Sequence, residues 1–269
     1  MTGKAKNIDR RISEFQRVGC FFLILLTNLT IFPLLIIMTL AGIIISSPAF
    51  VIIKIILHWS TERIIRFFVW CYGRGWLAIT FPFVRFKSEG IKNGGLVPPC
   101  IIVVNHLSFF DTFFMGALPF YDVVFALRAW PFKMFWYAPF MRLARYFDVE
   151  SMSWQKISEA GKNALEKGGT LLFYPEAHRS RDGELGRFFS GAFKMAVETG
   201  VKLIPLCITG TDVFIPPTRW WMKPARVHLR ALPAIDPNEF SGQTSHIQLR
   251  KFVKRLMSEN IESMRKEEI

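Results

Sequence analysis

The chain has 269 residues, of which 51% are hydrophobic and 27 are phenylalanine, and its formal net charge is +13. This apolar content exceeds that of an ordinary water-soluble domain, while the excess of basic residues suits an anionic membrane surface or a nucleic acid. Because the aromatic residues stand in apolar runs and do not alternate with a basic face, a lipid membrane is the expected partner and nucleic acid is not.

The first 57 residues predict a membrane element. Residues 1–17 are polar and basic, whereas residues 18–53 carry no charge. This uncharged stretch exceeds the roughly 20 residues of one membrane crossing, and its middle is interrupted by polar residues and a proline: Thr27, Asn28, Thr30 and Pro33. We therefore expect a basic cytoplasmic N-terminus at 1–17 and a helical hairpin in the membrane at 18–57, with a single tilted span and a buried tail as the alternative.

Basic residues flank the uncharged stretch, so the positive-inside rule places both of its ends on the cytoplasmic side. The expected location is a membrane, and in a bacterium the inner (cytoplasmic) membrane, with the following domain on its cytoplasmic face. Residues 55–86 continue as an amphipathic, aromatic-rich segment. An interfacial membrane element and an ordinary core helix are both open interpretations of this segment.

Residues 58–269 predict an α/β domain, with a mixed, mostly parallel sheet flanked by helices. Apolar runs bounded by turn residues predict strands at 100–106, 170–176, 201–209 and 225–232. Helical spacing of apolar residues predicts helices at 108–118, 153–169 and 191–200, and a C-terminal amphipathic helix from Ser245. The four cysteines lack CxxC spacing, and no GxGxxG or GxxxxGK[ST] loop occurs, so no metal and no cofactor is predicted.

One histidine and one aspartate follow the first of these strands, in the stretch VVNHLSFFD at residues 103–111. His106 is expected at the carboxyl end of the strand and Asp111 in the following turn or helix, at the edge of an α/β sheet where ligands bind. Such a pair can act as a general base, with the carboxylate fixing the imidazole tautomer. A histidine held by a helix-capping aspartate is the alternative.

A second polar group follows the strand at 170–176. It contains Glu176, Arg179 and Arg187, and parallel neighbouring strands would bring it to the same sheet edge as His106. Guanidinium groups there suit a phosphate or a carboxylate. Arg181, Asp182 and Glu184 flank Gly183 and are interpreted as solvated turn residues.

These residues resemble the motifs of the glycerolipid acyltransferases, the PlsC-like family typified by lysophosphatidic acid (1-acyl-sn-glycerol-3-phosphate) acyltransferase. The first family motif, NHxSxxD, corresponds to Asn105, His106, Ser108 and Asp111. The third motif, FPEGTRS, corresponds to YPEAHRS at residues 174–180, and the segment SGAFKMAVETGVKLIPL leads to the fourth motif at Pro205. The likeness runs from about residue 85 to residue 236, the motif core of the domain.

The resemblance implies an O-acyltransferase that moves a fatty acyl group from acyl-CoA or acyl-ACP to the hydroxyl of a lyso-lipid, in phospholipid biosynthesis or remodelling. It implies His106 as the general base and Asp111 as the residue that orients it. The implied acceptor-site residues are Asn105, Ser108, Glu176, His178, Arg179, Ser180 and Arg187. No metal and no cofactor besides the thioester co-substrate is implied.

Two departures from the family pattern leave the acceptor open. Ala177 and His178 replace the usual glycine and threonine of the third motif, and Glu150 and Ser151 stand where the second motif carries an arginine. The acceptor is expected to be lysophosphatidic acid or another lysophospholipid, or alternatively a lyso-lipid of the acylated amino acid type. A non-catalytic membrane lipid-binding protein of the same fold is a further alternative, whereas a lipid A type acyltransferase would carry glutamate in place of Asp111.

Overall fold

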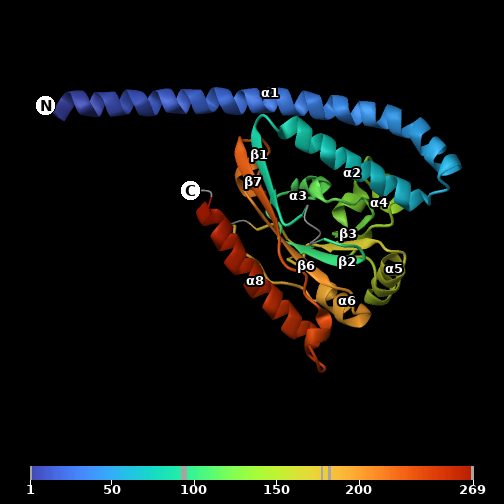
Figure 1. Ribbon diagram of the computed structural model, residues 1–269. Coiled ribbons are helices and arrows are strands. Elements are labelled where there is room, and N and C mark those ends of the chain that lie inside the picture. The colour runs from blue at the N-terminus through green and yellow to red at the C-terminus, as the bar shows by residue number, and fades with distance from the viewer. Residues whose placement is uncertain (1, 92–95, 177, 181–182, 268–269) are drawn as a thin grey trace.

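The computed structural model describes residues 2–91, 96–176, 178–180 and 183–267, with side chains described from residue 17 onward. A long N-terminal helix, α1 (Thr2–Ile56), runs along one side of an α/β domain and extends beyond it (Figure 1). A second helix, α2 (Thr61–Thr80), lies between α1 and the rest of the domain. Together the two helices form a layer over one side of the sheet.

The helical hairpin was predicted at the wrong place. α1 continues without a break through Pro33, and the chain reverses only at residues 57–60, so α1 and α2 form the two arms of the hairpin. The polar residues do not bend α1, because Thr27 and Asn28 each donate a side-chain hydrogen bond to the carbonyl four residues earlier, both at 2.7 Å. The polar groups are thereby satisfied inside the helix.

The segment of α1 from Arg17 to Ile56 is long and apolar enough to cross a membrane. It has 40 residues and a mean hydropathy of 2.5, and only 11% of its most apolar window is buried in the protein. At 1.5 Å per residue it measures about 60 Å, roughly twice the hydrocarbon thickness of a bilayer. The segment is therefore a candidate membrane element that is too long for one perpendicular crossing.

Seven strands form one sheet in the order β1-β7-β6-β2-β5-β3-β4. The strands are β1 (Val84–Glu89), β2 (Cys100–Val104), β3 (Val123–Leu127), β4 (Phe147–Asp148), β5 (Thr170–Phe173), β6 (Leu203–Thr209) and β7 (Ala225–Ala231). Every neighbouring pair is parallel except β6 and β7, which run antiparallel. The predicted mixed, mostly parallel sheet is confirmed, and its central strands β2, β5 and β6 are buried on both faces.

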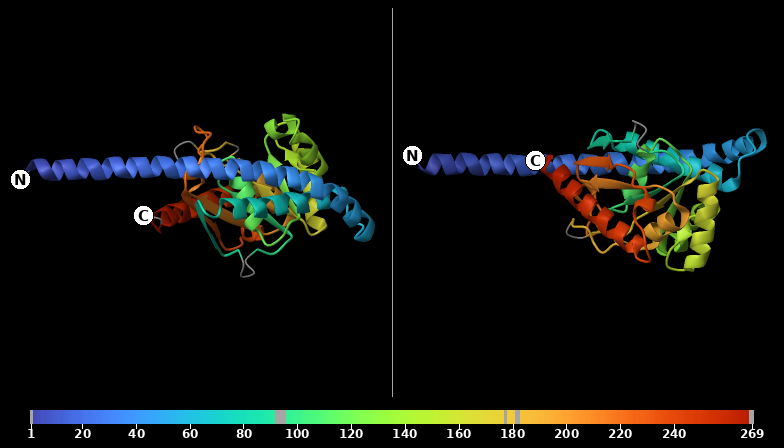
Figure 2. Two further views of the ribbon diagram at one scale, coloured as in Figure 1. Left: turned by 90° about the horizontal axis from the view of Figure 1, so that it is seen from above. Right: turned by 60° about the horizontal axis from the view of Figure 1, so that its bottom comes forward.

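Helices cover both sides of this sheet. The C-terminal helix α8 (Ser245–Glu267) crosses the face opposite α1 and packs on β6 and on α6 (Gly191–Thr199) (Figure 2). The remaining helical elements are α3 (Asp111–Phe114), η1 (Met115–Ala117), η2 (Trp130–Lys133), α4 (Ala138–Leu143), α5 (Trp154–Glu166), α7 (Thr211–Phe214) and η3 (Pro237–Glu239). The helix expected at 108–118 is therefore shorter than predicted and ends in a 3-10 turn.

α2 is a core helix of the domain on the side that faces the sheet. Trp76 is fully buried, and the largely buried Arg66 pairs with Asp122 at 2.7 Å. Gly73 lies against Gly116 of η1 so closely that a Cβ on Gly116 would come within 2.5 Å of the Gly73 carbonyl carbon. Only two glycines permit this approach, which fixes the segment after β2 against α2.

Candidate active site

The site forms where β2 and β5 end side by side. The two strands pair in parallel with Val103 opposite Phe173, so His106 and Glu176 each lie three residues beyond the same rung of the sheet. Asn105 fixes the end of β2 to β6: its side-chain amide donates to the Ile208 carbonyl at 2.9 Å, and its oxygen accepts from the Ile208 amide at 2.7 Å. The Asn105 side chain, paired through both its nitrogen and its oxygen, therefore has a structural role.

His106 and Asp111 lie in contact, as the motif spacing predicts. His106 Nδ1 is 2.8 Å from Oδ2 of Asp111, which is completely buried. The same Oδ2 accepts hydrogen bonds from the amides of Leu107 at 2.7 Å and Ser108 at 2.8 Å. Because a carboxylate has no donor, His106 carries its proton on Nδ1, which leaves Nε2 free to accept a proton from a substrate.

Glu176 holds the backbone of the site. It is 5% exposed, its Oε1 accepts from the His106 amide at 3.0 Å, and its Oε2 accepts from the Gly186 amide at 2.7 Å. Burial raises the pKa of this carboxyl, and the two amide donors and His106 oppose that rise. Glu176 thereby connects the loop after β2 to the loop that precedes α6.

Other motif residues also bind main-chain groups. Ser108 Oγ donates to the Ile215 carbonyl at 2.7 Å, and the amide of Ser180 donates to the His106 carbonyl at 2.8 Å. The Tyr174 ring packs on the His106 imidazole with 4.4 Å between centroids, and burial raises the pKa of the Tyr174 hydroxyl. The Ser180 amide and the Tyr174 ring therefore contact His106 directly, and Ser108 fixes the loop that follows it.

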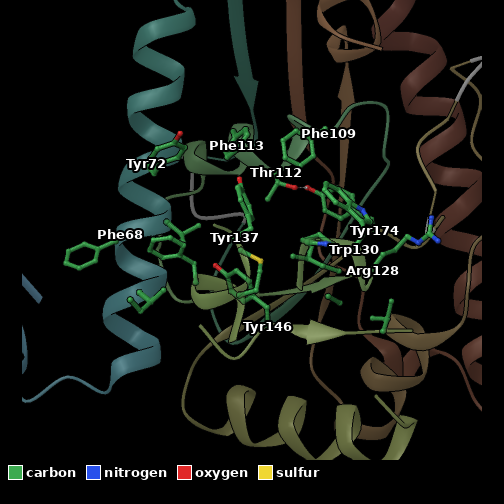
Figure 3. Close-up of a pocket in the computed structure, with 18 of the residues that line it drawn as sticks. Phe68, Tyr72, Phe109, Thr112, Phe113, Arg128, Trp130, Tyr137, Tyr146 and Tyr174 are labelled. Atoms are coloured by element: carbon green, nitrogen blue, oxygen red, sulfur yellow. Dashed lines mark hydrogen bonds between the residues drawn. The ribbon is translucent and has the colours of Figure 1, made fainter. Parts of the chain in front are cut away.

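A cavity of about 1090 Å³ opens against His106. Its walls come from α1, α2, the loop after β2, the ends of β3 and β5, and the η2–α4 segment, and they are largely aromatic or aliphatic. Figure 3 shows part of this lining, with Tyr72 on α2, Thr112 beside Tyr174, and Tyr137 and Tyr146 from the segment around α4. The cavity therefore joins a polar pair at the sheet edge to an apolar space beneath α1.

The structure separates the predicted acceptor-site residues into two groups. His178 lines the cavity, although its side chain is exposed. Arg179 and Arg187 are exposed and do not contribute to the described lining; Arg187 lies over the ring of Phe189, which does. Ala177, Arg181 and Asp182 lie outside the described residues.

The two charged residues of the described cavity lining were not among the predicted site residues. Arg128, at the end of β3, and Glu150, after β4, line the cavity and pair at 2.7 Å. The sequence contains a weak signal for Glu150, since it stands at an unusual place in the second motif. No local pattern points to Arg128, because its partners are 22 and 50 residues away.

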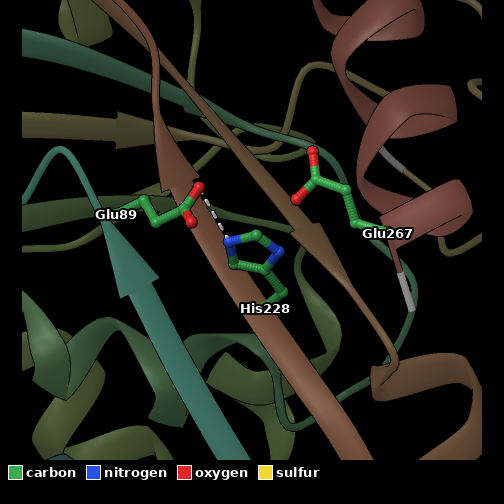
Figure 4. A group of neighbouring side chains, drawn as sticks. All are labelled: Glu89, His228 and Glu267. Atoms are coloured by element: carbon green, nitrogen blue, oxygen red, sulfur yellow. Dashed lines mark ion pairs between the residues drawn. The ribbon is translucent and has the colours of Figure 1, made fainter.

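A second cluster of titratable side chains lies at the other end of the sheet. Glu89, His228 and Glu267 approach one another there (Figure 4), with His228 Nε2 3.1 Å from Glu89. Arg230 bonds to both carboxylates, at 2.7 Å to Glu89 and 2.8 Å to Glu267. With a guanidinium already between the carboxylates, the cluster is an ion-pair network that ties α8 to the sheet edge.

Comparisons with known proteins match the same region of the chain. Residues 85–209 match the profile of the Acyltransferase family. The chain is 30% identical over 151 residues to the chloroplastic 1-acyl-sn-glycerol-3-phosphate acyltransferase of Arabidopsis thaliana, covering 52% of this chain and 41% of that protein. It is 26% identical over 176 residues to the 1-acyl-sn-glycerol-3-phosphate acyltransferase of Pseudomonas aeruginosa, covering 62% and 65%.

Among solved structures, the fold resembles that of PlsC from Thermotoga maritima, a 1-acyl-sn-glycerophosphate (LPA) acyltransferase. The TM-score is 0.71 at 24% sequence identity, over 90% of this chain and 98% of the other. The sequence alignments span less than two thirds of the two curated relatives. The structural likeness therefore establishes the fold over 90% of this chain.

Proposed function

Because this chain carries a PlsC-like glycerolipid acyltransferase domain, we propose that it transfers a fatty acyl group from acyl-CoA or acyl-ACP to the hydroxyl of a lyso-lipid. Lysophosphatidic acid or another lysophospholipid is the proposed acceptor, in phospholipid biosynthesis or remodelling. The observation that carries the proposal is the His106–Asp111 pair at the wall of a large apolar cavity.

The proposed reaction uses the two ring nitrogens of His106 in different roles. Nε2 removes the proton from the acceptor hydroxyl, whose oxygen attacks the thioester carbonyl and forms a tetrahedral intermediate. Asp111 holds Nδ1–H and stabilises the imidazolium that results. When the intermediate collapses, the C–S bond breaks, the imidazolium returns its proton to the thiolate, and an ester and a free thiol are released.

The lining of the cavity supports a lipid substrate. A pocket of about 1090 Å³ with mostly apolar walls suits a long hydrocarbon chain, which contributes binding energy by leaving water. Among the described lining residues, His106 stands beside Asp111, and Arg128 contacts both Glu150 and His178. A lyso-lipid can therefore place its hydroxyl at His106 while its chain remains among apolar side chains.

We place α1 in the bilayer interface, parallel to its plane. Asn28 of α1 bonds to the Met222 backbone and Thr39 bonds to Tyr72, so the domain packs along much of the apolar segment. A helix that crossed the bilayer perpendicularly over this segment would carry the domain into the hydrocarbon. The outer side of α1 exposes large apolar residues, including Phe21 and Ile44 at 63% and 72%.

The loop before β7 supports this orientation. Its backbone at Met222 is bonded to Asn28, and next to Met222 the side chains of Trp220 and Trp221 are 75% and 40% exposed. Tryptophan with neighbouring basic residues, here Arg219, is typical of the membrane–water interface. The loop thus adds a second lipid contact beside α1.

The experiment that tests the function is an acyl-transfer assay on the purified full chain. Oleoyl-CoA and oleoyl-ACP are each incubated with a panel of lyso-lipids, including an acylated amino acid, and the products are identified by mass spectrometry. A diacyl product that disappears in His106→Ala supports the proposal. Absence of transfer from both donors to every acceptor contradicts it and favours a non-catalytic lipid-binding protein.

A further inference from the structure

Charge in the cavity is confined to one pair of residues. Among the described residues that line it, Arg128 and Glu150 are the formally charged ones, and their charges cancel. They lie 2.7 Å apart, and their side chains are 38% and 42% exposed, so the pair stands at the solvent end of the cavity. A ligand that enters there meets a cation and an anion together.

Glu150 is held in place as an anion. Its Oε1 accepts from Arg128 Nε, and its Oε2 accepts from the Ala129 amide at 2.9 Å. The Ala129 amide and the Arg128 guanidinium lower the pKa of the Glu150 carboxyl. Each carboxylate oxygen can accept further hydrogen bonds, so Glu150 can still bind an external donor.

His178 completes the group. Arg128 Nη1 lies 2.9 Å from His178 Nδ1, and a guanidinium offers only donors. His178 Nδ1 therefore accepts, which leaves the ring neutral with its proton on Nε2. The three side chains together offer a guanidinium with unused N–H groups, a ring N–H donor and a carboxylate.

We propose that Arg128, Glu150 and His178 form the acceptor head-group site, and that it selects a zwitterionic lysophospholipid, one with a phosphodiester and an ammonium group. The phosphodiester binds the free N–H groups of Arg128 and His178, and the ammonium binds Glu150. A phosphate monoester, as in lysophosphatidic acid, brings about two negative charges beside Glu150 and finds no second cation in the described lining. Like charges at this distance oppose binding. The inference rests on the proposed acyl transfer and names its acceptor.

The test compares two acceptors with the same acyl chain, lysophosphatidylethanolamine and lysophosphatidic acid, each in mixed micelles with oleoyl-CoA and the full chain. The measured quantity is the ratio of their kcat/KM values. Wild type is expected to favour the zwitterion by about tenfold or more. Glu150→Gln removes the anion but keeps an acceptor oxygen, and is expected to move the ratio about tenfold toward lysophosphatidic acid, through KM for the acceptor.

The matched control is Glu159→Gln, which removes the same charge from an exposed position on α5, outside the cavity lining. It is expected to leave the acceptor ratio at the wild-type value. Arg128→Gln is expected to raise KM for both acceptors and to leave KM for oleoyl-CoA unchanged. A rise in the donor KM instead would assign the group to the thioester substrate and overturn the inference.

The remaining outcomes separate the inference from the function on which it rests. A wild-type preference for lysophosphatidic acid, or a ratio that Glu150→Gln does not move, overturns the inference and leaves acyl transfer intact. No transfer to either acceptor, nor to any other lyso-lipid of the panel, overturns both. Unchanged circular dichroism and melting of the Glu150→Gln variant establish that its altered ratio does not come from misfolding.

Discussion

The backbone amide of His106 donates a hydrogen bond to Oε1 of Glu176 across 3.0 Å. Glu176 of the third motif is therefore bound to the main chain of His106 in the first motif. Since Oε2 of Glu176 accepts from Gly186 as well, one buried carboxylate holds two loops that come from different strands. The position of His106 depends on this carboxylate as well as on Asp111.

Glu176→Gln should destabilise the protein and lower its turnover. A glutamine side chain has one acceptor oxygen, so its NH₂ group would face either the His106 amide or the Gly186 amide, and one buried donor would lose its partner. Such a loss costs about 1–3 kcal/mol. Thermal unfolding in detergent measures the cost. A melting temperature and a kcat equal to those of wild type would contradict this role.

His106→Ala should reduce acyl transfer to background. The substitution removes the imidazole that contacts Asp111, and loss of a general base costs about 10²–10⁴-fold in rate. Flotation with anionic vesicles should be unchanged, because His106 lies inside the domain and α1 is intact. Retained turnover in this variant would reject the mechanism.

Asp111→Asn should be less damaging than His106→Ala. The asparagine oxygen can still accept from His106 Nδ1 and from the amides of Leu107 and Ser108, so the ring orientation survives. What is lost is the negative charge that stabilises the imidazolium, so kcat should fall, but by less than in His106→Ala. Steady-state kinetics of both variants in one assay decide the order. An Asp111→Asn loss equal to that of His106→Ala would show that the charge is indispensable.

Arg230→Gln should loosen the attachment of α8 in a pH-dependent way. Lys87 and then Arg230 lower the pKa of Glu89 to about 2, so the stability that Glu89 contributes is present above its ordinary pKa of about 4.5 and is lost as the pH falls toward 2. The partly exposed Arg230–Glu89 pair is worth at most about 1 kcal/mol at neutral pH. The stability difference between wild type and variant, from urea unfolding, should therefore shrink between pH 4.5 and 2. A constant difference would contradict the linkage.

Replacing Trp220 and Trp221 together by serine should weaken membrane binding. Both side chains are exposed beside α1, and removing two interfacial indoles is expected to reduce vesicle affinity about tenfold. Sedimentation with phosphatidylglycerol vesicles measures the affinity. Phe252→Ser on α8, at 37% exposure on the opposite face, is the matched control and should bind as wild type does. If the tryptophan variant bound vesicles as tightly as wild type, the loop before β7 would not be a lipid contact.

The sequence was sufficient for the parts of the site that lie close together in the chain. Five residues separate His106 from Asp111, and the buried strands before His106 and before Glu176 are unmistakable apolar runs. Their parallel pairing follows from the alternation of strand and helix. The location of the site at the shared strand ends was therefore predictable, and so was the mixed sheet.

The sequence was insufficient where interacting residues lie far apart in the chain. It was also insufficient where a helix continues through a proline that was expected to break it. Nothing local joins Arg128 to His178, and Asn105, Ser108 and Glu176 were expected to meet substrate although they bind main-chain groups. The bend expected at Pro33 is absent, because packing of α1 against α2 and the domain outweighs the one backbone hydrogen bond that the proline removes. β1 and β3 were not predicted. The start of β1 was assigned to the amphipathic segment at 55–86, and the apolar run VVFAL of β3 was not interpreted as a strand.

Because α1 forms one wall of the cavity, it cannot be truncated or exchanged without changing the pocket. Residues between Met38 and Ile53 form part of the lining, and Met38 lies against Gly75 on α2. A truncated chain that begins at α2 would therefore lack this wall, and the pocket would be open on that side. The N-terminal helix and the site beneath it form a single module, so an unrelated anchor cannot replace α1 without rebuilding the pocket.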